Sequence, residues 1–367
     1  MELSKNSFTA IVLSVLIIIL LNPYTVKIPL INEILGFFVI AFLPGFLCLK
    51  ITGTESSDKI NMIIYSLGLS LTIIILTGFL LNMILPMTGH IPITPLNVKA
   101  MIISILLVLL SLSYKKFDET VFEVDIRDLL SPANILLCCI PFIVIIGVYL
   151  RNHGITAPLL LIIPILSILP LFVALNRIPQ RSYPLAVFVI AISLLFHTSL
   201  ISNYIWGWDI QIEYYLSKLV LTNGFWDSSI PEAYNAMLSI VILAPIFSIF
   251  CKINPLWVFK VIYPFIFSFV PLGLYQFFRK NVNEKISFFA VFFFMSLFVF
   301  FTEMLALARQ QIAELFLALI LLVMADKKIK GMHKSLLFVI FSFSLVVSHY
   351  GLSYIFMLML FLSMFLV

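Results

Sequence analysis

The sequence predicts an all-α, polytopic membrane protein, a transmembrane helix bundle of about 12 spans. Of its 367 residues, 62% are hydrophobic and only 11% are charged, whereas soluble domains carry about 25% charged residues. The mean hydropathy is +1.17, and the apolar residues gather in runs close to the roughly 20 residues that a spanning helix needs. This composition excludes a soluble enzyme, a disordered chain and a collagen-like chain.

Polar or proline-bearing links separate the apolar runs and define the expected spans. The first run follows Lys5 and is predicted to be a retained helix, because no small-residue cleavage site follows it. The chain stops inside the last run, so a longer protein is expected. The predicted spans are 8–22, 31–50, 61–85, 96–113, 133–150, 157–175, 184–202, 256–278, 286–302, 310–325, 335–350 and a run that begins near residue 353.

The basic residues between the runs predict the orientation in the cell membrane. Cytoplasmic loops of membrane proteins carry an excess of Lys and Arg. A cytoplasmic N-terminus satisfies this rule for the first seven spans. The inner side then holds Lys5, Lys50, Lys59, Lys115, Lys116, Arg127, Arg177 and Arg181, and the outer side holds Lys27, Lys99, Arg151 and Lys218.

The apolar run 236–251 is predicted not to cross the membrane. It has only about 16 residues and contains Pro245, which makes it short for a crossing. A crossing would also put the basic residues of the later links on the outer face, against the charge rule. These residues are Arg279, Lys280, Lys285, Lys327, Lys328, Lys330 and Lys334.

The polar stretch 203–234 is then an outer loop, and it carries two carboxylates at helical spacing. Asp209 and Glu213 are four residues apart, so they share a face of a helix. The segment Ile210–Leu221 is amphipathic and fits a helix that lies along the membrane surface. The two acids could hold a divalent cation or supply a general base. Alternatively, they face water beside the aromatic anchors Trp206 and Trp208.

Later segments bring more ionisable groups to the same outer face. Glu303, Arg309 and Glu314 bracket a turn between two apolar helices, where charges are costly and often functional. Pairing of Arg309 with a glutamate for helix packing is the alternative. Lys260 lies near the outer end of the span 256–278, where it either snorkels to the interface or binds a phosphate. His349 ends a helix, where the backbone could satisfy it.

The order of these parts resembles the GT-C superfamily of membrane glycosyltransferases, which use polyprenyl-phosphate-linked sugars. The resemblance rests on the acids of WGWDIQIEYYLSKLVL, on NPLWVFK ending at Lys260, and on Ala308-Arg309 followed by Glu314. It covers 184–367 as a GT-C-like membrane core and leaves 1–183 as a six-helix N-terminal region of unknown role. Together with LARQQIAELF and SHYG, these stretches also resemble an uncharacterised family of large archaeal-type membrane proteins. The chain departs from the GT-C pattern in having Glu314 in place of Asp and six preceding helices.

The resemblance implies roles for the acidic residues. Asp209 would be the general base that activates the acceptor, or would help to hold a metal such as Mg or Mn, and Glu213 would assist. Glu303 or Glu314 would complete the acidic pocket, with His349 in a supporting position. The site would act on the outer face of the membrane.

The resemblance also implies a donor site and partners. Arg309 and Lys260 would bind the donor phosphate, and Asp209, Glu213 and Glu314 would line one cavity with them. The expected partners are a polyprenyl-phosphate sugar donor, membrane lipids and an acceptor that the sequence does not define. The scattered basic residues form no nucleic-acid patch. The alternative functions are a transporter or lipid flippase, or a non-catalytic subunit of a cell-envelope assembly complex.

Overall fold

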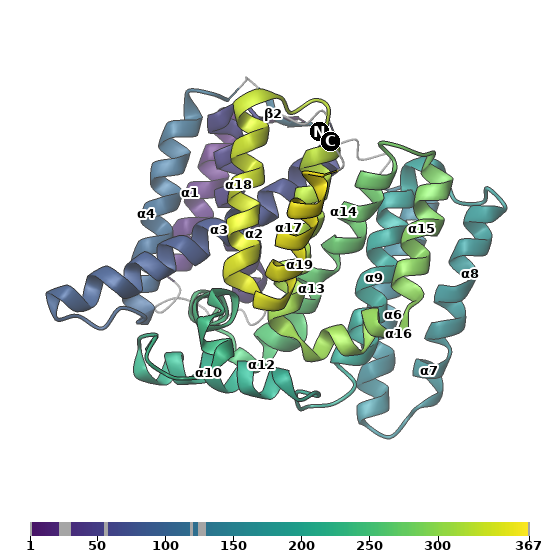
Figure 1. Ribbon diagram of the computed structural model, residues 1–367. Coiled ribbons are helices and arrows are strands. Elements are labelled where there is room, and N and C mark those ends of the chain that lie inside the picture. The colour runs from purple at the N-terminus through teal and green to yellow at the C-terminus, as the bar shows by residue number, and fades with distance from the viewer. Residues whose placement is uncertain (1, 22–30, 55–57, 118–119, 124–129, 366–367) are drawn as a thin grey trace. The chain divides into compact units, whose positions relative to one another are not determined.

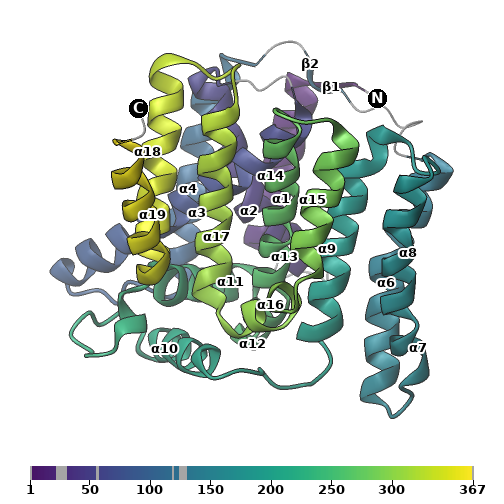
Figure 2. The same cartoon turned by 45° about the vertical axis from the view of Figure 1, so that its right-hand side comes forward.

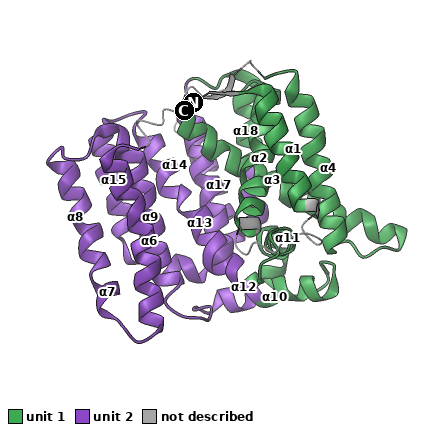
Figure 3. Cartoon of the chain, turned by 180° about the vertical axis from the view of Figure 1, so that it is seen from behind, with its two compact units in different colours: residues 1–126, 215–255, 328–341 green, residues 127–214, 256–327, 342–367 purple. Residues whose placement is uncertain are grey.

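The computed structural model describes residues 2–21, 31–54, 58–117, 120–123 and 130–365, which are almost entirely helical (Figure 1). The chain forms two compact units, each built from three segments (Figure 3). Unit 1 contains Met1–Ile126, Tyr215–Pro255 and Lys328–Phe341, and unit 2 contains Arg127–Tyr214, Leu256–Lys327 and Ser342–Val367. Both units draw on both halves of the chain, so this division differs from the predicted one between residues 183 and 184. The predicted division stays a prediction.

Unit 1 holds the first four long helices and the apolar run that follows the polar stretch 203–234. Its two short strands pair antiparallel. Its elements are β1 (Glu2–Ser4), α1 (Lys5–Leu21), α2 (Ile31–Thr52), α3 (Lys59–Ile84), η1 (Leu85–Thr88), α4 (Pro95–Tyr114), β2 (Thr120–Glu123), most of α10 (Asp209–Asn223), η3 (Ala233–Ala236), η4 (Ser239–Leu243), α11 (Ala244–Cys251) and the start of α18 (Gly331–Ser348).

Unit 2 holds the remaining helices and the first turns of α10. Its elements are α6 (Pro132–Asn152), α7 (Ala157–Leu160), α8 (Ile162–Ala174), η2 (Gln180–Ser182), α9 (Tyr183–Ser199), most of α12 (Pro255–Trp257), η5 (Val258–Ile262), α13 (Tyr263–Phe267), α14 (Phe269–Phe278), α15 (Glu284–Ser296), α16 (Phe298–Phe301), η6 (Glu303–Ala306), α17 (Ala308–Ala325), the end of α18 and α19 (Tyr350–Ser363).

Nine helices in the described part of the chain are long and apolar enough to cross a membrane. The prediction of an all-helical, multi-pass protein is therefore confirmed. The count of about 12 stays a prediction, because the first and last expected spans are shorter helices and 286–302 is a pair bent by 67°. The nine are Glu33–Thr52, Lys59–Thr88, Pro95–Tyr114, Pro132–Asn152, Ala157–Ala174, Gln180–Ser199, Pro255–Phe278, Ala308–Ala325 and Gly331–Ser348.

Close helix packing in unit 1 depends on the Pro44-Gly45 step inside α2. The Gly45 N–H donates to the Ser70 Oγ of α3 at 2.8 Å. A Cβ at Gly45 would lie 2.0 Å from the Ser66 carbonyl oxygen, so only glycine lets α2 and α3 approach this closely. The glycine of this step thus marks a tight helix contact.

The apolar run 236–251 forms one short, buried helix in unit 1. The π-helical turn η4 and α11 together cover Ser239–Cys251 and pack against α2, α3 and α4. A helix of this length spans about 20 Å, less than the roughly 30 Å of a bilayer core. The length agrees with the prediction that the run does not cross, which itself stays a prediction.

Unit 2 is a bundle in which α9, α14, α15 and α17 lie side by side, with α12 and α16 at one end (Figure 2). The other end collects basic side chains. Lys280 pairs with Asp326 at 3.4 Å, and Lys285 donates to the Ala174 carbonyl oxygen at 2.7 Å. These contacts bring the 279–285 turn next to the ends of α8 and α17. The candidate site lies at the opposite end.

Candidate functional site

Arg309, at the start of α17, is the centre of a buried charged cluster in unit 2. Its Nη2 donates to Asp209 Oδ2 at 2.8 Å, and its Nη1 donates to Glu213 Oε1. The Ala308 N–H donates to the other Glu213 oxygen at 2.8 Å. This N–H lies in the first turn of α17, where backbone donors have no partner within the helix and the dipole favours an anion. Glu213 therefore neutralises both the arginine and a helix end.

The first turns of α10 supply both carboxylates. Asp209 begins the helix and Glu213 follows one turn later, so both project from one face, as the four-residue spacing predicts. Just before the helix, Gly207 has φ +122°, and a Cβ there would lie 2.4 Å from the Ala306 Cβ. Only glycine combines this backbone conformation with the close approach to η6. Gly207 thus lets the loop deliver Asp209 to Arg309.

The two carboxylates differ in their exposure to solvent. The Glu213 side chain is fully buried, whereas the Asp209 side chain is 32% exposed and the Arg309 side chain 5%. Burial raises the pKa of Glu213 to about 7, although Arg309 and the Ala308 N–H lower it in part. Asp209 is consequently the acid of this pair that a substrate can reach, and Glu213 is the one that holds the arginine in place.

The other side of the arginine faces the turn between α18 and α19. The guanidinium lies 5.9 Å from the centre of the Tyr350 ring, within the range of a cation–π contact. His349 caps α19, because its Nδ1 accepts the Leu352 N–H at 2.9 Å. Burial, followed by the charge of Arg309, lowers the pKa of His349 to about 4. His349 is therefore neutral at pH 7 and serves as a helix cap, the alternative that its position allowed.

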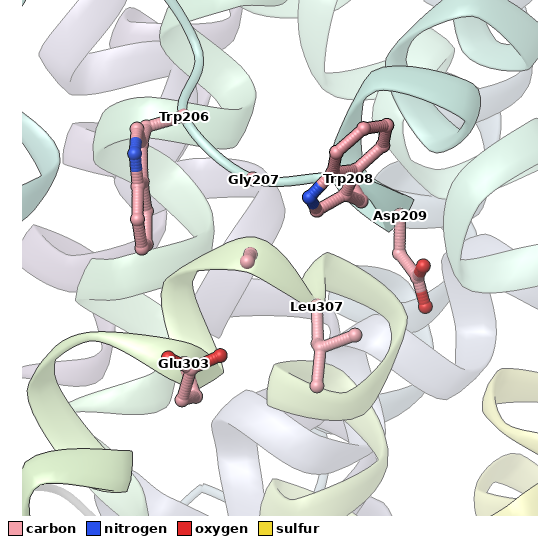
Figure 4. A pocket seen from close by; sticks show the side chains of 7 residues that line it. Trp206, Gly207, Trp208, Asp209, Glu303 and Leu307 are labelled. Carbon is pink, nitrogen blue, oxygen red and sulfur yellow. The ribbon is translucent and has the colours of Figure 1, made fainter.

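A cavity of about 350 Å³ opens beside Asp209 (Figure 4). Trp206, Trp208 and Glu303 flank it, and both indole rings are exposed. Glu303 stands on η6, across the cavity from Trp208 in Figure 4. Gly207, Ala306 and Leu307 complete the lining. The cavity therefore presents two carboxylates and two aromatic rings.

Lys260 holds the loop that forms part of this cavity. It lies on the π-helical turn η5, and its side chain is buried. The ammonium donates to the carbonyl oxygens of Ser202 and Tyr204, the latter at 2.9 Å. These two residues precede Trp206 and Asp209 in the same loop. Lys260 thus ties the loop to the helix of residues 255–278.

The structure brings together only some of the residues that the sequence singled out. Asp209, Glu213 and Arg309 meet, and Glu303 shares the cavity with Asp209. The expectation of one cavity lined by Asp209, Glu213, Lys260, Arg309 and Glu314 is wrong, because of these only Asp209 is among the lining residues. Arg309, Lys260 and Glu213 are buried, and each binds other groups of the protein.

Glu314 lies one turn further into α17 and does not join the ion pairs with Arg309. It accepts a hydrogen bond from Gln310 Nε2 at 2.9 Å. The neighbouring Gln311 is fully buried and donates to the Met304 carbonyl oxygen at 2.8 Å. The Gln311 amide therefore fixes the η6 turn onto α17. The described residues contain no group of three His, Cys, Asp or Glu side chains arranged to hold a metal.

Sequence reasoning missed several features of the site. Trp206 and Trp208 were expected only as membrane anchors, and Gly207 and Tyr350 were not singled out. The WGWD run carried a signal that could have been used, because a glycine between two large aromatics just before a helix indicates a special backbone conformation. No comparable signal marks Tyr350.

Comparison with family models, with curated proteins and with solved structures found no match to this chain.

Proposed function

We propose that the protein is a membrane glycosyltransferase that moves a sugar from a polyprenyl-phosphate-linked donor to an acceptor on the outer face of the membrane. The observation that carries this proposal is the partly exposed Asp209 carboxylate at the mouth of a cavity, oriented by the buried Arg309. A transferase for a lipid-linked donor needs a base at the membrane boundary. Charged groups beside apolar helices are costly and are commonly retained for function.

In the proposed reaction, Asp209 acts on the acceptor. The acceptor oxygen or nitrogen attacks the anomeric carbon of the sugar, and its proton passes to the Asp209 carboxylate. The bond between the anomeric carbon and the phosphate oxygen breaks, and both electrons leave with the polyprenyl phosphate. Glu303, on the cavity wall, would hold hydroxyl or amine groups of the substrate, since an ionised carboxylate accepts hydrogen bonds only.

The two cations that the sequence assigned to the donor phosphate, Arg309 and Lys260, already have other partners in the structure. Arg309 is shared by two carboxylates, and Lys260 is bound to two backbone carbonyls. Contact of either cation with a phosphate therefore requires it to leave a present partner. In the arrangement described here, both cations position the loop and its carboxylate.

The distribution of charge in unit 2 supports an outer site and a cytoplasmic opposite end. Arg279, Lys280 and Lys285 gather at the end of the bundle that lies away from Asp209. Cytoplasmic ends of membrane helices carry such an excess of basic residues. Cysteine labelling of Asn283→Cys with a membrane-impermeant reagent tests this orientation, and labelling from outside intact cells would contradict it.

The decisive experiment is sugar transfer by the Asp209→Asn variant. Membranes containing the protein are incubated with polyprenyl-phosphate sugars labelled in the sugar, and label in the acceptor fraction is counted. Loss of a general base typically lowers a rate by roughly 10²- to 10⁴-fold, so transfer should become undetectable. Asp227→Asn is the matched control, because it makes the same change in the same loop outside the cavity. Transfer by Asp209→Asn at the parent rate would refute the proposal.

Protein stability must be measured beside transfer, because Asp209 is not a simple surface residue. In the structure Asp209 pairs with a buried arginine, and we expect a cost of roughly 1–2 kcal/mol, less than the 3–5 kcal/mol of a fully buried pair. A variant that melts as a cooperative unit and transfers no sugar separates catalysis from folding.

A transporter of lipid-linked substrates is the second candidate. It is favoured by the 67° break between Glu284–Ser296 and Phe298–Ala306, because discontinuous helices are typical of transporter sites. Movement of a labelled donor across vesicle membranes without cleavage of its sugar would support this alternative. Cleavage of the sugar without movement of the donor would support the transferase.

A further inference from the structure

The cavity beside Asp209 is acidic and aromatic, and none of the described residues that line it is basic. Its walls contain the carboxylates of Asp209 and Glu303 and the indoles of Trp206 and Trp208. Trp208 is 90% exposed, so its ring is available to a ligand. The Glu303 residue is exposed, and its side chain makes no hydrogen bond or ion pair with the described part of the chain.

The charges around the cavity sum to a negative value in either state of Glu213. Arg309 contributes one positive charge, which Asp209 balances. Glu213 adds a negative charge when ionised and none when protonated. Glu303 adds another negative charge that no described partner offsets. The cluster therefore carries a net charge of −1 or −2, a sum over these four side chains.

The other ionisable groups nearby in the chain do not reverse this sign at the cavity wall. The Lys260 ammonium does not line the cavity and is bound by the carbonyl oxygens of Ser202 and Tyr204. His349 is neutral at pH 7, because burial lowers its pKa to about 4. Among the described residues, an anion placed in the cavity would meet two carboxylates and no cationic lining residue.

This combination of groups has a defined chemical preference. The face of an indole ring attracts a cation, and the attraction strengthens as water is excluded. Carboxylates add charge-assisted hydrogen bonds to an ammonium group. We propose that the cavity is a subsite for a positively charged, ammonium-bearing group of the substrate, carried either by the transferred sugar or by the acceptor.

This inference rests on the proposed function for the identity of the substrate, but binding to the cavity can be measured without any transfer. Glucosamine, glucose and glucuronate form a matched set of probes with positive, neutral and negative charge on one ring scaffold. Their binding to the purified protein is measured by isothermal titration calorimetry at a pH where the amine is protonated. We expect glucosamine to bind roughly tenfold tighter than glucose, and glucuronate to bind more weakly still.

Two variants link this preference to the cavity. Glu303→Gln should remove most of the difference between glucosamine and glucose, because it removes the unpaired charge at nearly constant shape. Trp208→Ala should weaken glucosamine more than glucose. Glu232→Gln is the matched control, since Glu232 does not line the cavity, and it should leave all three affinities unchanged.

The outcomes separate this inference from the proposed function. Equal affinities for glucosamine and glucose, tighter binding of glucuronate, or an unchanged preference in Glu303→Gln would each overturn the cationic subsite. A clear preference for glucosamine in a protein that transfers no sugar would support the subsite and refute the transferase.

Ethanolamine distinguishes the two sources of the ammonium group. Equal binding of ethanolamine and glucosamine indicates an amine acceptor, and much tighter glucosamine binding indicates an amino sugar.

Discussion

The two units of the protein use buried polar side chains in different ways. In unit 1, the Asn82 amide of α3 donates to the Trp226 carbonyl oxygen at 3.0 Å and accepts the Trp226 N–H at 2.8 Å. The Trp226 indole N–H donates to the Asn235 carbonyl oxygen at 2.9 Å, and the Asn235 amide donates to the Asp227 carbonyl oxygen at 2.7 Å. Every side chain that takes part in this network is neutral. In unit 2, the corresponding network is built from charges.

The difference indicates which network serves folding and which serves function. A neutral hydrogen bond contributes about 0.5–1.5 kcal/mol and satisfies a backbone group. Burying charges costs several kcal/mol per ion, and apolar residues of similar volume often replace a buried ion pair without loss of stability. The Asp209–Glu213–Arg309 cluster also leaves an accessible carboxylate at a cavity, whereas the Asn82 network closes a loop. We therefore expect changes in unit 1 to affect stability alone and changes in unit 2 to affect both stability and binding.

Removal of the Glu213 carboxylate should give the largest loss of stability. Glu213→Ala removes one carboxylate from the buried Arg309 and the acceptor of the Ala308 N–H, which should cost about 3–5 kcal/mol. Glu213→Gln keeps an acceptor and resembles the protonated acid, which is substantially populated near pH 7 because the pKa is raised to about 7. Thermal unfolding in detergent compares the two variants. Equal losses for Ala and Gln would show that a neutral acceptor cannot replace the carboxylate, and would contradict a site that tolerates protonated Glu213.

The fold and part of the site could be predicted from the sequence because they depend on local pattern. Apolar runs of spanning length identify the long helices, and the spacing of Asp209 and Glu213 places them on one helix face. The breaks in the helices could not be predicted, because η4, η5 and the bend before η6 depend on how neighbouring helices pack. A pattern of hydrophobic residues contains no such information.

The partner of Arg309 also could not be predicted from the sequence. Glu303 and Glu314 lie six and five residues from it, so either was a plausible partner in sequence. The structure instead joins Arg309 to Glu213, 96 residues earlier in the chain. Glu303 faces the cavity and Glu314 binds Gln310. Which glutamate neutralises a buried arginine depends on the tertiary approach of α10 to α17, and spacing does not encode it.

Replacement of Lys260 tests whether this cation holds the loop or binds a ligand. Lys260→Met retains length but leaves the Ser202 and Tyr204 carbonyls without their donor, and orphaned buried groups cost about 1–3 kcal/mol each. We expect a loss of about 2–4 kcal/mol and faster proteolysis within 200–208. Lys218→Met, at an exposed position of α10, is the control. Unchanged stability with a raised KM for the donor would instead support a phosphate contact.

The neutral network of unit 1 should respond in stability only. Asn82→Ala removes both hydrogen bonds to the Trp226 backbone and should cost about 1–3 kcal/mol. Glucosamine binding and sugar transfer should stay at parent levels once the fraction of folded protein is matched. A loss of glucosamine affinity in folded Asn82→Ala would break the separation of roles between the two units.

The smallest expected effect is a pH dependence at His349. Burial lowers its folded-state pKa to about 4, below an unfolded value of about 6.5. The stabilisation from neutral His349 is therefore complete above pH about 6.5 and is lost progressively as the pH falls toward about 4. Protonation of Nδ1 also removes the acceptor for the Leu352 N–H that begins α19. We expect a contribution of roughly 1–2 kcal/mol, because the imidazole retains some contact with solvent.

The His349→Asn variant tests this pH dependence. Asn is a good helix cap that does not titrate, so His349→Asn should lose less stability than the parent between pH 7 and pH about 4.5. Carboxylates titrate in both proteins, so the difference between the two unfolding curves isolates the histidine. Parallel curves would show that His349 is protonated in the folded protein without cost and that the charge of Arg309 does not reach it.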